Sequence, residues 1–132
     1  MINSMEISAI DPSSIPAAVG GYANGLDVRG AQRLLFVSGQ IPQDREGRIP
    51  DGIENQCRLV WANLTAVLRE ADMEVTNLVK VTTFLSDRVH SAVNTAVRNE
   101  VLGTHRPALT VVLAGIWDPA WLIEIEAIAA SS

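Results

Sequence analysis

Cysteine is almost absent from this chain, since Cys57 is the only one in 132 residues. It lies inside a helical pattern. An intrachain disulfide is therefore excluded, and a cysteine-based metal cluster is disfavoured. A chain that uses no disulfides fits a reducing compartment, so we expect a cytoplasmic protein.

Long apolar runs are also missing. The longest, residues 108–116 and 127–130, are far too short to cross a bilayer. The first residues, Met1 to Glu6, show no basic stretch followed by an apolar one, so we expect no secretory signal. No membrane partner is predicted.

Basic residues are few. The chain has 10 lysines and arginines against 15 acidic residues, which gives a net charge of −5. A nucleic-acid partner would need a basic surface to neutralise phosphates, so none is expected. The chain also lacks a Walker loop, a dinucleotide fingerprint, a nucleophile elbow and zinc-ligand spacing. The two histidines, His90 and His105, stand alone, and surface positions are the favoured interpretation for both.

The apolar residues that are present, 48% of the chain, suffice for the core of one α+β domain spanning residues 1–132. Residues 1–19 are predicted to be irregular apart from a short strand near 5–10. β-branched and apolar runs predict further strands, and apolar steps of three and four predict two helices. The predicted strands are 25–28, 33–38, 78–85, 109–114 and 121–129, and the predicted helices are 53–71 and 86–102.

This order predicts one mixed sheet with both helices packed on one face. The apolar stripe of the second helix is expected to include Val89 and Ala96, and Gly103 is expected to end that helix. Residues 34–37 form a continuous apolar run, which is typical of a strand buried on both faces. Residues 111–113 are similar. A short chain with such strands is expected to bury its open sheet face against another subunit.

Two acids on the last strand are candidates for chemistry. Glu124 and Glu126 are two residues apart, so both point to one face of the strand, among isoleucines and alanines. Such a carboxylate could hold water or exchange a proton with a substrate, or the two acids could form ion pairs at a subunit boundary. The spacing leaves both interpretations open. In Ser38-Gly39-Gln40, the glycine permits close backbone approach to a ligand, or marks an ordinary turn.

Four stretches in the right order, covering residues 20–130, resemble the RidA/YjgF family, also described as L-PSP endoribonuclease-like. They are Leu35-Phe-Val-Ser-Gly-Gln-Ile-Pro, Ile53-Glu-Asn-Gln-Cys-Arg with residues 63–68, Val79-Lys-Val-Thr-Thr-Phe-Leu-Ser-Asp with Ala92-Val-Asn, and Ile123-Glu-Ile-Glu-Ala-Ile-Ala. The resemblance implies a chorismate-mutase-like fold and a homotrimer with small-molecule clefts between subunits. It also implies a deaminase, a hydrolase that converts reactive imines and enamines to 2-oxo acids and ammonia without metal or organic cofactor.

Matching positions carry the expected cleft residues. The resemblance implies that Tyr22, Ser38, Gly39 and Asn94 line the cleft, and that Glu124 positions the attacking water. One position departs from the family pattern. Pro-Ala-Leu-Thr stands where the family usually has Pro-Ala-Arg followed by Ser or Thr, so Leu109 replaces the arginine that would clamp a substrate carboxylate.

Two positions further on, Val111 matches a cysteine found in some members, which makes the expected cleft more apolar. Arg106 precedes a proline at an odd offset from Leu109, so it is not the favoured replacement for the clamp. Three hypotheses follow. The first is an imine or enamine deaminase with a shifted substrate range, and the second is a non-catalytic trimer that binds a metabolite or a partner. The third, an endoribonuclease, rests on the older family name alone.

Overall fold

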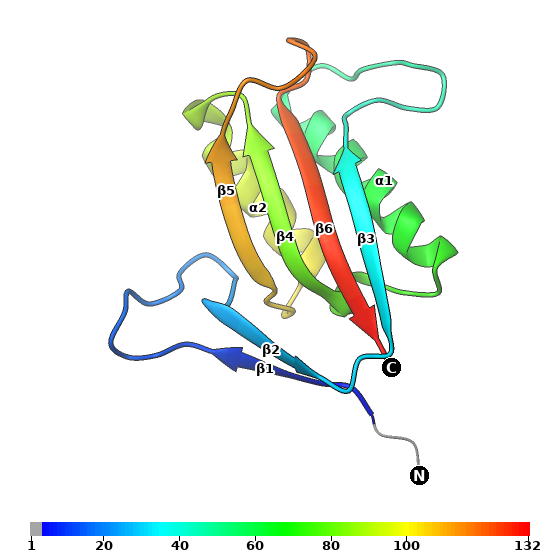
Figure 1. The fold of residues 1–132 in the computed structure, drawn as a ribbon. Helices are drawn as coiled ribbons and strands as arrows, with labels where there is room; N and C mark the ends of the chain where they lie inside the picture. Colours follow the sequence, from blue (N-terminus) through cyan, green and yellow to red (C-terminus); the bar gives the residue numbers. More distant parts are fainter. Residues whose placement is uncertain (1–3) are drawn as a thin grey trace.

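The computed structural model describes residues 4–132, and its elements follow the predicted order within a few residues (Figure 1). They are β1 (Glu6–Ile10), β2 (Gly25–Arg29), β3 (Arg33–Gln40), α1 (Ile53–Glu70), the short 3₁₀ helix η1 (Val75–Asn77), β4 (Leu78–Leu85), η2 (Arg88–His90), α2 (Ser91–Leu102), β5 (Ala108–Leu113) and β6 (Ile123–Ser131). No helix in this part of the chain is long and apolar enough to span a membrane.

Four strands form the main sheet in the order β3-β6-β4-β5. The β6 strand is antiparallel to both β3 and β4, whereas β4 and β5 are parallel. A parallel pair needs a crossover connection, and α2 supplies it. The sheet is therefore mixed, as predicted.

The expectation that all strands share this sheet is wrong. The strands β1 and β2 pair only with each other, as a separate two-stranded sheet. Between β2 and β3 the chain turns at Gly30, whose φ of 74° is one that L side chains rarely adopt. A Cβ there would lie 3.0 Å from the carbonyl oxygen of Ser4, so glycine lets the turn stay tight. A single bridge between Ala23 and Ala108 links the N-terminal region to the edge of the main sheet.

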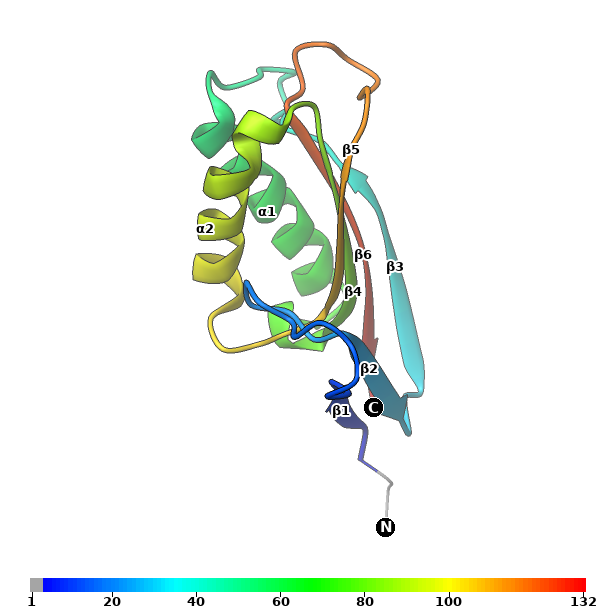
Figure 2. The ribbon, with the colours of Figure 1, turned by 90° about the vertical axis from the view of Figure 1, so that its left-hand side faces the viewer.

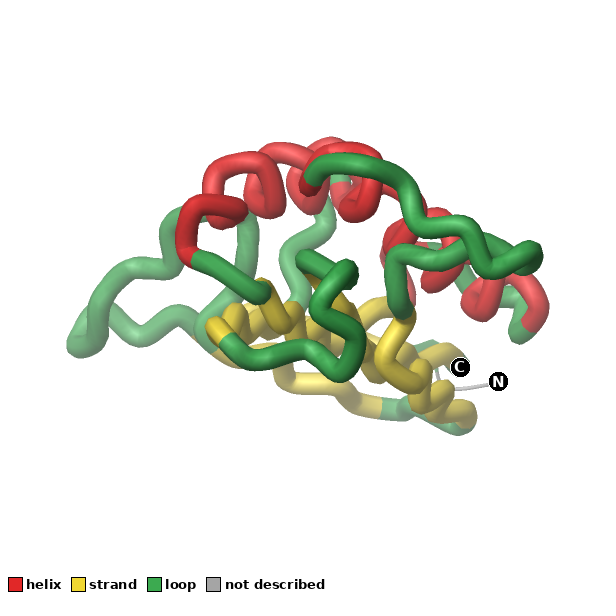
Figure 3. The backbone as a smooth tube through the Cα atoms, turned by 90° about the horizontal axis from the view of Figure 1, so that it is seen from above, coloured by secondary structure: helices red, strands yellow, loops and turns green. Residues whose placement is uncertain are grey.

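Both helices cover one face of the four-stranded sheet, as predicted (Figures 2 and 3). Helix α1 contributes one apolar stripe to the core, including the fully buried Cys57, Val60 and Leu64. The sheet contributes alternate side chains of β4 and β6 to the same core. They include Val81, Leu85, Ile123 and Ile125, all fully buried. Burying a side chain of this kind stabilises the fold by roughly 1.5–3 kcal/mol.

The Cys57 thiol is expected to be inert. It is fully buried in this core, and burial raises its pKa to about 11. The thiolate is the reactive form, and very little of it exists at pH 8. We expect a thiol reagent such as dithionitrobenzoate to leave the native protein unlabelled and to label one thiol after unfolding in guanidinium chloride. Stoichiometric labelling of the native protein would contradict this placement.

Within residues 4–132, the opposite sheet face has no second layer (Figure 2). The prediction that residues 34–37 are buried on both faces is wrong for the single chain, because Leu34 and Phe36 are 60% and 70% exposed. Val112 is 40% exposed on the same face. We call Leu34, Phe36 and Val112 the open apolar face.

Helix α2 presents part of the predicted stripe to the sheet, because Val97 is buried and Val93 and Val101 pack against the core, whereas Val89 and Ala96 do not. Val89 is 75% exposed, because it lies in η2, where its backbone N–H donates to the Asp87 side chain over 2.8 Å. Ala96 is exposed too. The buried residues of α2 are Asn94, Val97, Arg98 and Leu102, of which Asn94, Arg98 and Leu102 were not predicted. The helix ends at Gly103 with a φ of 60°, as predicted.

Candidate functional site

A bulge in β3 brings three predicted site residues together. Val37 pairs with Ala127, and Gln40 pairs with Ile125. Between these two pairs, β3 has two residues and β6 has one, so β3 contains one extra residue. Ser38 and Gly39 are the residues in this bulge. Bulges of this kind recur beside active sites, where they redirect a side chain or end the pairing.

Glu124 fills the space that Gly39 leaves open. A Cβ at position 39 would lie 2.0 Å from the Glu124 Oε2 atom and 2.8 Å from its carboxyl carbon. Only glycine is compatible with this approach. In this chain the group that approaches Gly39 closely is the Glu124 side chain, and the approach of a ligand stays a prediction. We call Ser38, Gly39 and Glu124 the bulge group.

The surroundings of the two acids differ from the expectation. Ile123 and Ile125 point to the helices, whereas Glu124 and Glu126 pair with Phe84 and Thr82 on the opposite face. Glu126 is exposed and Glu124 is partly buried, so neither is deep within apolar atoms. Within residues 4–132, neither acid forms an ion pair. The Glu124 carboxylate can therefore accept hydrogen bonds from water or a ligand.

Other predicted residues lie on the helix side of the sheet. In the parallel pair, Leu109 is opposite Val81 and Val111 is opposite Thr83. Val81 and Thr83 are buried beneath the helices, so Leu109 and Val111 point to that side as well. Leu109 is partly buried against the core, and Val111 is 41% exposed.

Asn94 and Tyr22 are the other two predicted residues on this side. We call Tyr22, Asn94, Leu109 and Val111 the helix-side group. Asn94 lies on the buried face of α2, is 2% exposed, and its Oδ1 atom has no hydrogen-bond partner. Tyr22 is held beside the start of β5, because the N–H of Ala23 donates to the carbonyl of Pro107 over 3.1 Å.

Arg106 lies close to Tyr22 rather than beside Leu109. Both line a cavity of about 320 Å³. Its other walls come from the N-terminal segment, at Asp11, Pro12, Ser13, Ile15, Ala17, Ala18 and Asn24. Whether Arg106 replaces the cation at residue 109 stays a prediction.

Sequence reasoning missed Arg98. This arginine is 3% exposed, and its Nη2 donates to the carbonyl oxygen of Gly20. Burial lowers the pKa of the guanidinium, and nearby Tyr22 offsets part of this effect. Its spacing was a usable signal, because residues four apart on a helix share a face and Asn94 had already been placed in the cleft.

His105 has a structural contact. Its Nε2 atom lies 2.7 Å from the carbonyl oxygen of Leu78, which ties the loop before β5 to the start of β4. In the part of the chain that the structure describes, no three His, Cys, Asp or Glu side chains gather in a way that could hold a metal ion.

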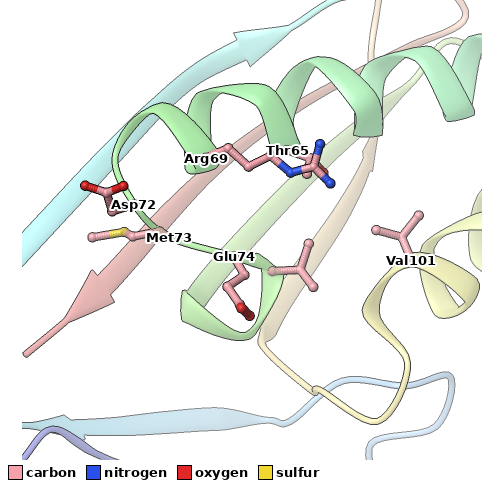
Figure 4. Close-up of a pocket in the computed structure, with 7 residues that line it drawn as sticks. Thr65, Arg69, Asp72, Met73, Glu74 and Val101 are labelled. Atoms are coloured by element: carbon pink, nitrogen blue, oxygen red, sulfur yellow. The ribbon is translucent and has the colours of Figure 1, made fainter.

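A cavity of about 640 Å³, larger than the one at Arg106, lies elsewhere (Figure 4). It sits between the end of α1, η1 and α2. Its lining is Thr65, Arg69, Asp72, Met73, Glu74, Val75 and Val101. None of the predicted site residues is among them, so size alone does not locate the site.

The bulge group and the helix-side group face opposite sides of the same sheet. Glu124 is on β6 and Leu109 on β5, with β4 between them. Two strand spacings correspond to about 10 Å, with the sheet itself in the way. Within one chain, a small molecule cannot touch both groups at once.

The sequence matches the family model described as Endoribonuclease L-PSP over residues 12–131. The chain belongs to the RidA/YjgF family. A RutC family protein of Pyrococcus abyssi is 37% identical over 116 residues, which cover 86% of this chain and 89% of that protein. Escherichia coli TdcF, named as a candidate reactive intermediate deaminase, is 31% identical over 127 residues, covering 93% of this chain and 96% of TdcF.

Solved structures of RidA/YjgF proteins share the fold. The Rid family protein YyfB of Yersinia pestis superposes with a TM-score of 0.83 at 25% identity, covering 94% of this chain and 98% of YyfB. The structure of E. coli TdcF with bound serine superposes with a TM-score of 0.71 at 31% identity, covering 95% and 99%. A mixed sheet with two helices on one face is thus the architecture of this RidA/YjgF chain.

Proposed function

We propose that this protein is a hydrolytic deaminase that converts reactive imines and enamines to carbonyl compounds and ammonia. The observation that carries the proposal is the Glu124 carboxylate, which lies against Gly39 at the bulge and has no cationic partner among the described residues. Membership of the RidA/YjgF family and the deaminase name of TdcF support the same activity.

Glu124 would act on the attacking water. A carboxylate that accepts a hydrogen bond from water orients it and takes its proton as the oxygen attacks the imine carbon. Glu124 would return this proton to the nitrogen, which gives a carbinolamine. A second proton passes from the carbinolamine hydroxyl to the nitrogen as the C–N bond breaks, so ammonia leaves and the oxygen stays as the carbonyl. An enamine would first be protonated at carbon to form the imine. The backbone at Ser38 and Gly39 would bind the polar end of the substrate. No step calls for a metal or organic cofactor.

The active unit would be a homotrimer of chorismate-mutase-like chains with a cleft between neighbouring subunits. The support is the separation of the two groups, because a cleft between chains can join the bulge group of one copy to the helix-side group of the next. The open apolar face supports the same assembly, since large exposed apolar patches are rare on monomers. A cytoplasmic location, with its reducing conditions, suits the single free thiol of Cys57.

The substrate range would favour apolar substituents. Leu109 and Val111 offer no hydrogen-bond donor from their side chains, whereas the family arginine expected at position 109 would bind a carboxylate through two bonds. We therefore expect faster ammonia release from imines with an apolar side chain, such as the imine of leucine, than from 2-aminoacrylate.

The test is an ammonia-release assay on imines generated by an amino-acid oxidase. Acceleration over the protein-free reaction, larger for the leucine imine than for 2-aminoacrylate, is the expected result. The oxidase alone and heat-denatured protein serve as controls. No acceleration with neutral, acidic or apolar imines would remove the proposal.

The second candidate is a non-catalytic trimer that binds a small metabolite or a partner in the same cleft. Leu109 is the observation that favours it, because the family reaction would lose its usual anion clamp. Calorimetry against a metabolite library, combined with the absence of ammonia release, distinguishes this candidate. An endoribonuclease is the least supported, since the net charge of −5 opposes RNA binding.

A further inference from the structure

Arg98 is a buried positive charge without a counter-ion. Only 3% of the residue is exposed, and no acid forms an ion pair with it in residues 4–132. A guanidinium carries five N–H donors, and the contact recorded here is a single bond from Nη2 to the Gly20 carbonyl. The buried Nε atom has no partner. Burying a charge in this way is expensive unless an anion completes its hydrogen bonds.

Two further buried polar side chains on the helix side of the sheet have atoms without a hydrogen-bond partner among the described residues. Asn94 lies one helical turn before Arg98, and its Oδ1 atom is buried without a donor. Thr83 is fully buried on the face of β4 beneath the helices, and its hydroxyl also has no partner. Most buried polar side chains in folded proteins are hydrogen-bonded, so three incomplete groups on α2 and β4 indicate a place prepared for a polar ligand.

The arrangement separates polar from apolar contacts. Leu109 and Val111 point to the helix side of β5, so they supply an apolar wall on the side of the sheet that α2 covers. From α2, Arg98 supplies donors and the Asn94 Oδ1 supplies an acceptor. A molecule with a carboxylate, an adjoining N–H group and an apolar tail has one group for each of these partners.

We propose that Arg98 is the anion-binding residue of this protein, and that its cleft takes 2-imino acids and 2-oxo acids with apolar side chains. Charge recognition then comes from α2, while position 109 on β5 contacts the apolar tail. This inference rests on the proposed function for the identity of the cleft, and it adds the charge and shape of the ligand.

Gly20 lies against the Arg98 guanidinium, and Gly21 lies against the neighbouring Asn99 side chain. Gly20 and Gly21 have φ values of 101° and 88°, and a Cβ on Gly21 would lie 2.4 Å from the Oδ1 atom of Asn99. The carbonyl of Gly20 already uses one donor of Arg98. A purely structural arginine that only anchors this segment is the competing interpretation, and the experiment below separates the two.

The probe is a stable pair of ligands, 4-methyl-2-oxopentanoate and its uncharged amide, which differ only in the anionic group. Calorimetry should show that the wild-type protein binds the acid about 10- to 100-fold more tightly than the amide, as expected for charge-assisted bonds. Arg98→Met should abolish this preference and change the affinity for the amide by less than about threefold. Arg98→Lys keeps the positive charge but loses the paired N–H donors of the guanidinium, so it should retain only part of the preference for the acid.

Equal binding of acid and amide by the wild-type protein would overturn the inference, as would a full preference retained by Arg98→Met. If circular dichroism shows that Arg98→Met does not fold, the test is the NMR resonance of the Arg98 Nε–H in the wild-type protein. Its disappearance in Arg98→Lys assigns the resonance. It should shift with the acid and not with the amide, and an unchanged resonance overturns the inference. Ammonia release without a preference for the acid rejects the role of Arg98 alone. An Arg98-dependent preference without ammonia release rejects the proposed reaction alone.

Discussion

Replacing Glu124 with glutamine is expected to lower the rate of ammonia release from the preferred imine about 10²- to 10³-fold. Glutamine has nearly the same shape, so it can occupy the space above Gly39 that the carboxylate fills. It cannot take a proton from water, and proton transfer by a positioned side chain is what the carboxylate supplies. The ammonia assay measures the rate, and thermal unfolding should show little change in stability.

Glu126→Gln is the matched control. Glu126 is on the same strand and the same face, two residues further on, but it is exposed and lies over Thr82 rather than against the bulge. We expect its ammonia release to stay within about twofold of wild type, since a solvated carboxylate away from the reacting atoms contributes little. Similar losses in both variants would indicate a general effect of charge on this face. Full activity of Glu124→Gln would remove Glu124 from the mechanism.

The helices and strands of this chain were predictable because their signals are local. The apolar steps of three and four in α1 and the β-branched run of β4 each determine one element without help from the rest of the fold. The family motifs also placed Ser38, Gly39 and Glu124 in one site, and the structure brings these three together. Their roles as ligand-binding and catalytic residues stay predictions.

The parts that were not predicted depend on how distant segments meet. The pairing of β1 with β2 joins strands separated by residues 11–24, and the turn at Gly30 then directs β3 into the other sheet. The buried face of α2 includes Asn94 and Arg98 beside the predicted valines, and it leaves out Val89, because Asp87 places the first turn in a 3₁₀ helix outside the core. An arginine on a mixed helix face looks like a solvated residue in sequence, and its four-residue spacing from Asn94 is the sequence signal that points to its burial.

The open apolar face leads to the other large expected effect. Phe36→Glu should convert the proposed homotrimer to single chains, with the mass falling to that of one chain, 14.2 kDa. Phe36 is 70% exposed in an isolated chain, so its replacement removes few contacts within the fold. In an assembly that covers this face, however, the new carboxylate would be buried in apolar surroundings beside Ile128. An unpaired buried charge costs on the order of several kcal/mol, and the trimer would contain three of them.

Light scattering coupled to gel filtration measures the mass, and Val89→Glu is the control. Val89 is 75% exposed in η2, which leads into the helix layer, so this variant should keep the mass of three chains. A Phe36→Glu protein that stays trimeric, or a Val89→Glu protein that dissociates equally, would place the interface elsewhere.

Ammonia release is a second measurement that separates the two variants. Dissociation separates the bulge group of one copy from the helix-side group of the next, so Phe36→Glu should lose ammonia release together with its mass. Glu124→Gln should lose the reaction while remaining a trimer, because its defect is chemical and leaves the open apolar face unchanged.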